Sequence, residues 1–69
     1  MSDVIEFCFN GESMQVREGM TLSAYLQTQA LPSRYIVVRN NEIVPSSQIA
    51  KTYIQPRDTI DIMTAMSGG

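Results

Sequence analysis

The first part of the chain alternates hydrophobic and polar positions in the way that a β-hairpin requires. Within the first hydrophobic stretch, the residues that share one face are Ile5, Phe7 and Phe9. Asn10-Gly11 follows directly, and both residues accept the positive φ that a tight hairpin turn needs. A second alternating segment, with Met14 and Val16, comes after this turn. The pattern predicts an N-terminal hairpin over residues 3–17.

The hydrophobic spacing then changes to that of a helix. Three hydrophobic residues fall at positions i, i+3 and i+4, namely Leu22, Tyr25 and Leu26. Thr21 is a favourable N-cap, and Met20 before it is placed to pack on Tyr25 as a hydrophobic staple. Because Pro32 restricts the residues before it, we expect this helix to end by about Ala30.

A second hairpin is predicted from a β-branched run. Residues 35–38 read Tyr-Ile-Val-Val, which is typical of a strand covered on much of both faces. Asn40-Asn41 indicates a turn, and residues 42–44 form a short returning strand that Pro45 ends. Residues 46–52 have room for at most a short helical turn, with Ile49 packed inward.

The last predicted strand covers residues 59–64 and follows a turn at residues 55–58. Its alternation places Ile60 and Ile62 on one face, with Asp61 and Met63 on the other. The element order is therefore hairpin, helix, hairpin, short turn and strand. One helix covers one face of a single mixed sheet, and it supplies the crossover that lets the first and last strands pair in parallel.

This order predicts an α+β fold of the β-grasp (ubiquitin-like) type, with one mixed sheet packed on one main helix. The chain has 69 residues, enough for one domain, which we place at residues 1–64, with a flexible C-terminal diglycine tail at residues 65–69. So small a domain leaves little room for a deep active-site cleft, which disfavours an enzyme.

The amino-acid composition excludes further classes of function. Hydrophobic residues make up 43% and charged residues 17%, which argues against a disordered chain. The net charge is −2 and the five basic residues are scattered, so we expect no nucleic-acid binding. No apolar run approaches the length of a membrane span, so we expect no membrane partner either. With one cysteine and neither a signal peptide nor a long apolar run, we expect a cytoplasmic protein.

Few residues offer catalytic or metal-binding chemistry. The sequence has no histidine, no cluster with metal-ligand spacing and no phosphate-binding glycine loop, so we expect no catalytic residue, metal or bound cofactor. Cys8 is interpreted as a structural strand residue, because the neighbouring sequence offers neither a cation nor a helix N-terminus that would activate a nucleophilic thiol. A solvated surface position is expected for the scattered carboxylates Glu6, Glu12, Glu18, Glu42, Asp58 and Asp61.

The strongest functional signal is the tail Ser67-Gly68-Gly69. Glycine at both of the last two positions arises by chance in roughly 0.5% of chains. Because its two glycines have no Cβ, the tail is suited to threading through a narrow channel into a partner's active site, with Ser67 and Gly68 lying in that channel. There the Gly69 carboxylate becomes an electrophile once it is adenylated. Met63 and Met66, adaptable side chains near this tail, are predicted to dock partner proteins.

In these features the sequence resembles the ubiquitin-like sulfur carriers, and most closely the branch that serves bacterial thiamine biosynthesis. The resemblance runs over the whole chain in family order. The matching segments are Phe9-Asn10-Gly11, Gly19-Met20-Thr21-Leu22, Asn40-Asn41-Glu42-Ile43-Val44-Pro45, Asp58-Thr59-Ile60 and Ser67-Gly68-Gly69. Two positions depart from the family pattern: Pro56-Arg57 stands where a turn glycine is common, and Arg39 where an apolar strand residue is common.

The resemblance implies a carrier that is a cosubstrate and not an enzyme. A ubiquitin-activating-like adenylyltransferase would use ATP to adenylate Gly69. Persulfide sulfur derived from a cysteine desulfurase would displace AMP and leave a thiocarboxylate on Gly69. Thiazole synthase would then take that sulfur into the thiazole ring of thiamine.

Three alternatives remain open at this point. In the first, the same thiocarboxylate belongs to a small subunit of molybdopterin synthase and donates sulfur to a pterin precursor. In the second, the chain is a ubiquitin-like modifier conjugated to target lysines through Gly69. In the third, it is a β-grasp interaction module whose tail has no role.

Overall fold

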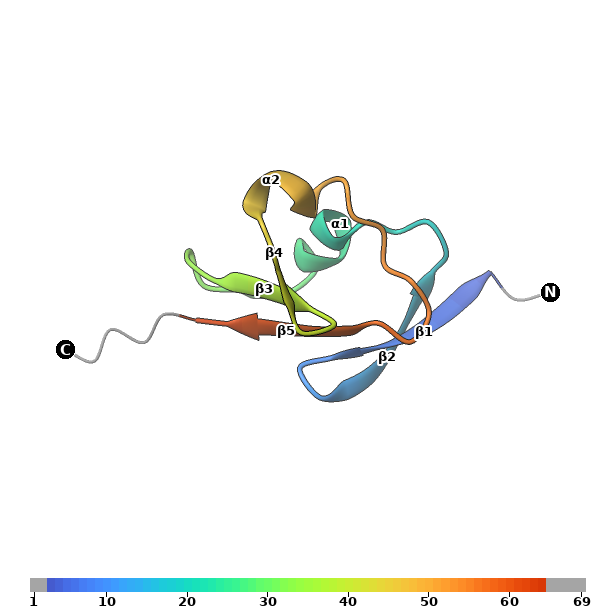
Figure 1. Cartoon of the computed structure of the whole chain (residues 1–69). Helices are drawn as coiled ribbons and strands as arrows, with labels where there is room; N and C mark the ends of the chain where they lie inside the picture. Colours follow the sequence, from blue (N-terminus) through green and yellow to red (C-terminus); the bar gives the residue numbers. More distant parts are fainter. Residues whose placement is uncertain (1–2, 65–69) are drawn as a thin grey trace.

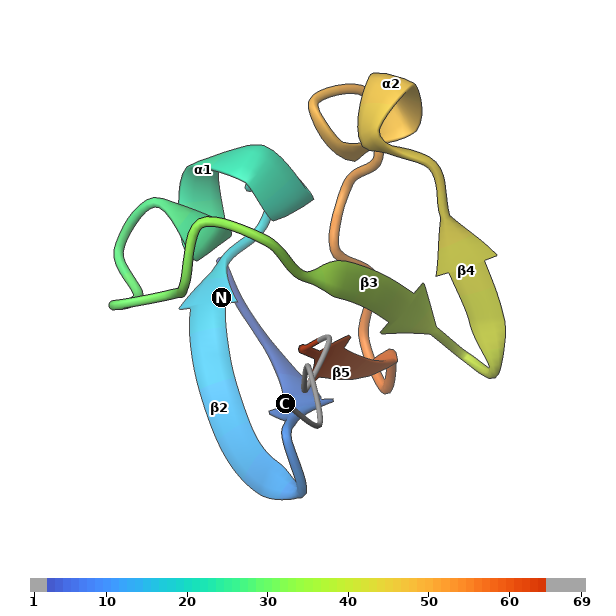
Figure 2. The ribbon, with the colours of Figure 1, turned by 90° about the vertical axis from the view of Figure 1, so that its left-hand side faces the viewer.

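The structure is a computed structural model, and it describes residues 3–64. A five-stranded sheet in the order β2-β1-β5-β3-β4 carries two short helices on one side (Figures 1 and 2). The elements are, in chain order, β1 Val4–Phe9, β2 Glu12–Arg17, α1 Leu22–Leu26, β3 Ile36–Arg39, β4 Glu42–Val44, α2 Ser46–Ile49 and β5 Thr59–Met63.

The sheet has the mixed topology that the sequence predicts. β1 and β5 pair in parallel, with Cys8 opposite Thr59 and Phe9 opposite Ile60. The two hairpins and the β3–β5 pair are antiparallel. β5 therefore lies in the middle of the sheet, although it is the last strand in the chain (Figure 1). This confirms the α+β, β-grasp prediction.

Both predicted asparagine turns are present. Asn10 and Gly11 have φ of 51° and 84°, and Asn40 and Asn41 have φ of 53° and 71°. Two successive residues with positive φ are typical of the turn that matches the twist of a two-stranded hairpin. Each turn thus follows from its own two residues, which explains why a local pattern was enough to predict it.

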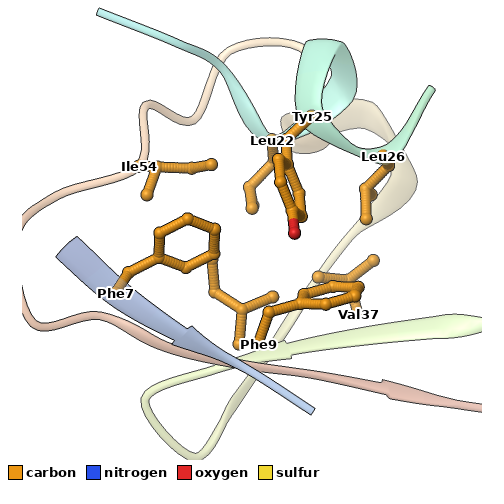
Figure 3. Close-up of a cluster of buried hydrophobic side chains, with 8 residues drawn as sticks. Phe7, Phe9, Leu22, Tyr25, Leu26, Val37 and Ile54 are labelled. Atoms are coloured by element: carbon orange, nitrogen blue, oxygen red, sulfur yellow. The ribbon is translucent and has the colours of Figure 1, made fainter. Parts of the chain in front are cut away.

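The hydrophobic core lies between the sheet and α1 (Figure 3). Tyr25 points from α1 toward β1, and its ring meets those of Phe7 and Phe9 edge to face, with centroids 5.1 Å apart in each pair. The remaining core side chains are Leu22, Leu26, Val37, Ile54 and Ile60. The predicted inward faces of the first strand, the helix and the last strand are confirmed.

The helix is shorter than predicted. Thr21 caps it as expected, its Oγ1 accepting a 3.1 Å hydrogen bond from the Ala24 amide. However, α1 ends at Leu26 and not near Ala30. Thr28 gives the physical reason: its amide and its hydroxyl both donate to the Tyr25 carbonyl, at 2.9 and 2.6 Å. These contacts reach back three residues rather than four, so the chain tightens and leaves the α-helix.

The burial of β3 also differs from the prediction. Val37 is buried, but Ile36 on the opposite face is 46% exposed, so the strand is covered on one face only. The layer of helices lies on one side of the sheet and leaves the other side to solvent (Figure 2). Ile49, in the short helix α2, packs against the core as expected.

Within residues 3–64, neither helix has the length and hydrophobicity that crossing a lipid bilayer requires. The proposed tail, residues 65–69, lies outside the described residues.

Candidate functional site

The candidate site is the segment that follows β5, because the predicted functional residues Met66, Ser67, Gly68 and Gly69 belong to it. All four lie outside the described residues, so their roles stay predictions. The structure does describe the strand that carries them. β5 is paired with β1 on one side and with β3 on the other, and its Ile60 side chain is fully buried. The segment is therefore attached to the most enclosed strand of the sheet.

The start of β5 is held by side chains from both hairpin turns. Asn10 Oδ1 accepts a 2.9 Å hydrogen bond from the Ile62 amide, and Asn40 Oδ1 accepts one of the same length from the Thr59 amide. The backbone adds hydrogen bonds from the Asn10 amide to the Ile60 carbonyl and from the Asn40 amide to the Thr59 carbonyl. The two asparagines thus both form a turn and fix the central strand.

Asp58, just before β5, corrects the prediction that the carboxylates are solvated. It is 4% exposed and accepts hydrogen bonds from Arg39 Nε (2.8 Å), Asn40 Nδ2 (3.0 Å) and the Gln55 amide (2.8 Å). Burial by itself raises the pKa of Asp58, but the hydrogen bonds from Arg39, Gln55 and Asn40, with the charge of Arg39, outweigh it and hold the pKa below its ordinary value.

This network explains one departure from the family pattern, and the backbone conformation of Arg57 explains the other. Arg39 stands in a strand because its guanidinium pairs with the Asp58 carboxylate. Arg57 has a φ of 70°, the left-handed conformation that favours glycine, which fits a position where glycine is common in the family. Both residues therefore shape the entry to β5, and neither points to a separate chemical site.

The outer face of the sheet carries exposed hydrophobic side chains near the end of β5. The strand register brings together Ile36, Val38, Ile43 and Met63, which we call the apolar patch. Met63 lies opposite Ile36, and Val38 lies between Ile43 and Asp61. The exposed fractions are 68% for Ile43, 56% for Met63 and 46% for Ile36, whereas Val38 is half-buried. Met63, predicted to dock partners, is thus exposed at the end of β5.

The other half of the same outer face is polar. The Ser13 hydroxyl donates a hydrogen bond to the Glu6 carboxylate across β1 and β2, and Gln15 and Arg17 continue the β2 row. Cys8 is half-buried there, beside a hollow of about 340 Å³ that Glu6, Ser13 and Arg57 also line. In residues 3–64 no group of three or more potential metal ligands occurs.

Comparison with known proteins decides the family. A sequence model of the ThiS family matches residues 6–69, which includes the diglycine segment. The chain belongs to the ThiS family. This confirms the resemblance to the ubiquitin-like sulfur carriers and to their thiamine branch, because ThiS proteins are small sulfur carriers of thiamine biosynthesis.

One solved structure supports the fold. The ThiS thiamine biosynthesis protein of Geobacter metallireducens superimposes with a TM-score of 0.81 at 20% sequence identity, covering 94% of this chain and 100% of that one. A curated relative, a thiazole synthase of Paramagnetospirillum magneticum, is 33% identical over 66 residues. That alignment covers 94% of this chain but only 20% of the relative's length, so the match concerns one part of a much longer protein.

The sequence interpretation found Met63 but missed Ile36, Val38 and Ile43 as neighbours of it. Ile36 and Val38 lie in β3 and Ile43 lies in β4, and only the pairing of β3 with both β4 and β5 brings them to the same part of the sheet as Met63. The sequence feature that could have revealed the apolar patch is Ile43, a large hydrophobic residue in a three-residue strand between an asparagine turn and Pro45.

Proposed function

We propose that this protein is the sulfur carrier that supplies the thiazole ring of thiamine, with the sulfur held as a thiocarboxylate on Gly69. The observation that carries the proposal is the match of the ThiS family model through residue 69. The described fold supports it, since β5, which directly precedes the C-terminal segment in the sequence, is the central strand of a β-grasp sheet. The protein then acts as a cosubstrate of partner enzymes.

The first step is activation by an adenylyltransferase of the ubiquitin-activating type. A Gly69 carboxylate oxygen attacks the α-phosphorus of ATP, and pyrophosphate leaves. The product is an acyl adenylate, whose carbonyl carbon accepts nucleophiles because AMP is a good leaving group. ATP is thus consumed by the partner, and this chain is expected to hold no cofactor.

The second step places sulfur on Gly69. The terminal sulfur of a persulfide, formed by a cysteine desulfurase, attacks the acyl carbon and displaces AMP. The resulting acyl disulfide is cleaved by a second thiol, which leaves in a disulfide with the former persulfide carrier and releases the thiocarboxylate. Thiazole synthase then receives the thiocarboxylate sulfur. The existence of a thiazole synthase that contains a segment similar to this chain supports this choice of acceptor.

The experiment is mass spectrometry of the C-terminal peptide after incubation with the adenylyltransferase, ATP and a sulfur source. Replacement of oxygen by sulfur adds about 16 Da, as does oxidation of Met63 or Met66 to the sulfoxide. Alkylation with iodoacetamide separates the two, because a thiocarboxylate reacts and a sulfoxide does not. Omission of ATP is the matched control.

The outcomes separate the alternatives. An alkylated Gly69 whose sulfur is consumed by thiazole synthase supports the proposal. Transfer to a pterin precursor on a molybdopterin synthase large subunit would favour that pathway instead. Isopeptide conjugates with target lysines would favour a protein modifier. No ATP-dependent change at Gly69 would contradict every carrier function and leave an interaction module.

A further inference from the structure

We propose that two copies of this protein form a dimer by pairing their β2 strands antiparallel, so that the two sheets join into one. β2 is an outermost strand of the sheet, and within residues 3–64 no other strand pairs with its outer edge (Figure 2). Because β1 separates β2 from β5, this surface is distinct from the segment that carries Gly69. The inference therefore does not depend on the proposed function.

The first argument is that the edge of β2 lacks the features by which proteins usually protect an exposed strand. These features are short length, proline, lysine and β-bulges. β4, the other edge strand, has three residues and is followed by Pro45. β2 instead pairs with β1 through six consecutive residues without a bulge, and it contains neither proline nor lysine. Its charged residues are Glu12 and Arg17, one at each end and opposite in sign.

The second argument is that the backbone of β2 permits one best register. The Glu18 amide donates a 2.6 Å hydrogen bond to the Asp3 carbonyl, and hydrogen-bonded pairs alternate along an antiparallel ladder. The backbone groups of Ser13, Gln15 and Arg17 therefore point to the open edge. In a β2–β2 ladder these residues pair only with one another. The register that uses all three places Gln15 opposite its own copy and Ser13 opposite Arg17 of the second copy.

The third argument is that the side chains are complementary in this register, in which opposite residues share a face. On the inner face, Met14 lies opposite Val16 of the second copy. Both side chains are half-buried against the core, so pairing covers apolar surface that is still exposed. On the outer face, Arg17 lies opposite Ser13 of the second copy, whose hydroxyl donates to the Glu6 carboxylate. The guanidinium thus meets a carboxylate, and the two-fold axis repeats both contacts.

Two features limit the strength of the dimer. Glu12 lies opposite Glu18 of the second copy, at exposed positions where solvent screens the repulsion. The Arg17 carbonyl already accepts a 3.3 Å hydrogen bond from the Met20 amide and has one lone pair left for the second copy. The contact also involves a single strand from each copy, which is small for a stable complex. We therefore expect a weak dimer whose population rises with protein concentration.

The test is sedimentation equilibrium of the protein from about 10 µM to about 1 mM. The main variant is Gln15→Pro, which removes an amide that points to the open edge and is not bonded to β1. The matched control, Gln15→Thr, changes the same side chain and keeps the amide. We expect the proline variant to raise the dimer dissociation constant about tenfold or more, and the control to change it less than about threefold. Thermal melts check that the variants are folded.

Charge exchange tests the same register through side chains. Arg17→Glu should weaken the dimer about tenfold or more, because it places two carboxylates together in each symmetric contact. Adding Glu6→Arg to Arg17→Glu restores opposite charges and should recover most of the lost affinity. A double variant as weak as Arg17→Glu alone would contradict the predicted register.

Cysteine cross-linking decides the question even if Gln15→Pro fails to fold. In a Cys8→Ser background, Gln15→Cys places two thiols at the two-fold axis, with Cα atoms about 5.5 Å apart, within the range of a disulfide. Ser13→Cys is the control, because the two copies of position 13 lie four residues out of register, more than roughly 13 Å apart. Under mild oxidation we expect a covalent dimer from Gln15→Cys and none from Ser13→Cys.

A wild-type protein that stays monomeric at about 1 mM would overturn the proposal. A dimer that folded Gln15→Pro does not weaken, or one in which Ser13→Cys cross-links and Gln15→Cys does not, would assign the contact to another surface or register and overturn it as well. None of these outcomes bears on ATP-dependent sulfur loading of Gly69, so the carrier function is tested separately.

Discussion

The two faces of the sheet both carry isoleucines near β5, but in opposite surroundings. On the inner face, Ile60 is fully buried among Phe9, Leu22 and other core side chains. On the outer face, Ile43 is 68% exposed and its neighbours Ile36 and Met63 are about half exposed. The inner face explains the stability of the fold through loss of apolar surface to water. The outer face loses less apolar surface to water on folding, so the same residue type contributes less to the stability of the fold there.

The largest effect on stability is expected from Ile60→Ala. Truncating a fully buried isoleucine costs about 3 kcal/mol of unfolding free energy, through lost hydrophobic transfer and the cavity left behind. A domain of this size has a net stability of similar magnitude, so this variant will be largely unfolded at room temperature. Ile60→Val, which removes one methyl group, should cost about 1 kcal/mol and stay folded. Urea titration followed by circular dichroism measures both.

Ile43→Ala makes the same chemical change on the outer face. We expect its unfolding free energy to stay within about 0.5 kcal/mol of wild type, as is usual for exposed positions. A loss comparable to that of Ile60→Ala would show that the outer face is packed, and the contrast between the two faces would disappear.

Asp58→Asn should have an intermediate effect, a loss of about 2 kcal/mol. Three donors converge on the carboxylate, whereas an amide offers one acceptor oxygen and turns an N–H group toward a remaining donor. Chemical denaturation at pH 7 measures the loss. Arg17→Gln, which removes a cation from an exposed β2 position, is a control expected to change little.

The same carboxylate gives a dependence on pH. Because the pKa of Asp58 is lowered by folding, its contribution is present above the unfolded value of 3.8 and is lost as the pH falls through the lower folded value. Wild type should therefore lose more stability than Asp58→Asn between about pH 5 and pH 3. Parallel stability curves for the two proteins over this range would show that Asp58 is not held in its ionised form by folding.

The smallest effect on stability, and the largest on function, is expected from deletion of Gly69 or addition of one residue after it. Gly69 follows the last core residue of β5 by several positions, so the Tm should remain within about 1 °C of wild type. Growth without added thiamine should be abolished in both cases, because the Gly69 carboxylate is missing or displaced. Normal growth with either variant would end the carrier hypothesis.

The features that the sequence predicted well are those fixed by neighbouring residues. Asn10-Gly11 and Asn40-Asn41 form turns through their own backbone conformations, and alternation alone places Phe7, Phe9 and Ile60 inside. The early end of α1 was missed because the Thr28 hydroxyl competes for a backbone carbonyl, which hydrophobic spacing does not reveal.

The features that were missed depend on residues far apart in the chain. The side-chain partners of Asp58 are Arg39 and Asn40, 19 and 18 positions earlier, so its burial required the packing of β3 beside β5. The apolar patch likewise required the register of three strands. The chemical role of Gly69 was predicted from the diglycine pattern and the family resemblance, and it stays a prediction.

The measurement that tests the central claim most directly is the mass of the C-terminal peptide after treatment with the adenylyltransferase, ATP and a sulfur source, followed by iodoacetamide. The account predicts an ATP-dependent product in which Gly69 carries sulfur and is alkylated, with Cys8 in a separate peptide. Consumption of ATP without sulfur on Gly69, or no reaction at all, would contradict it.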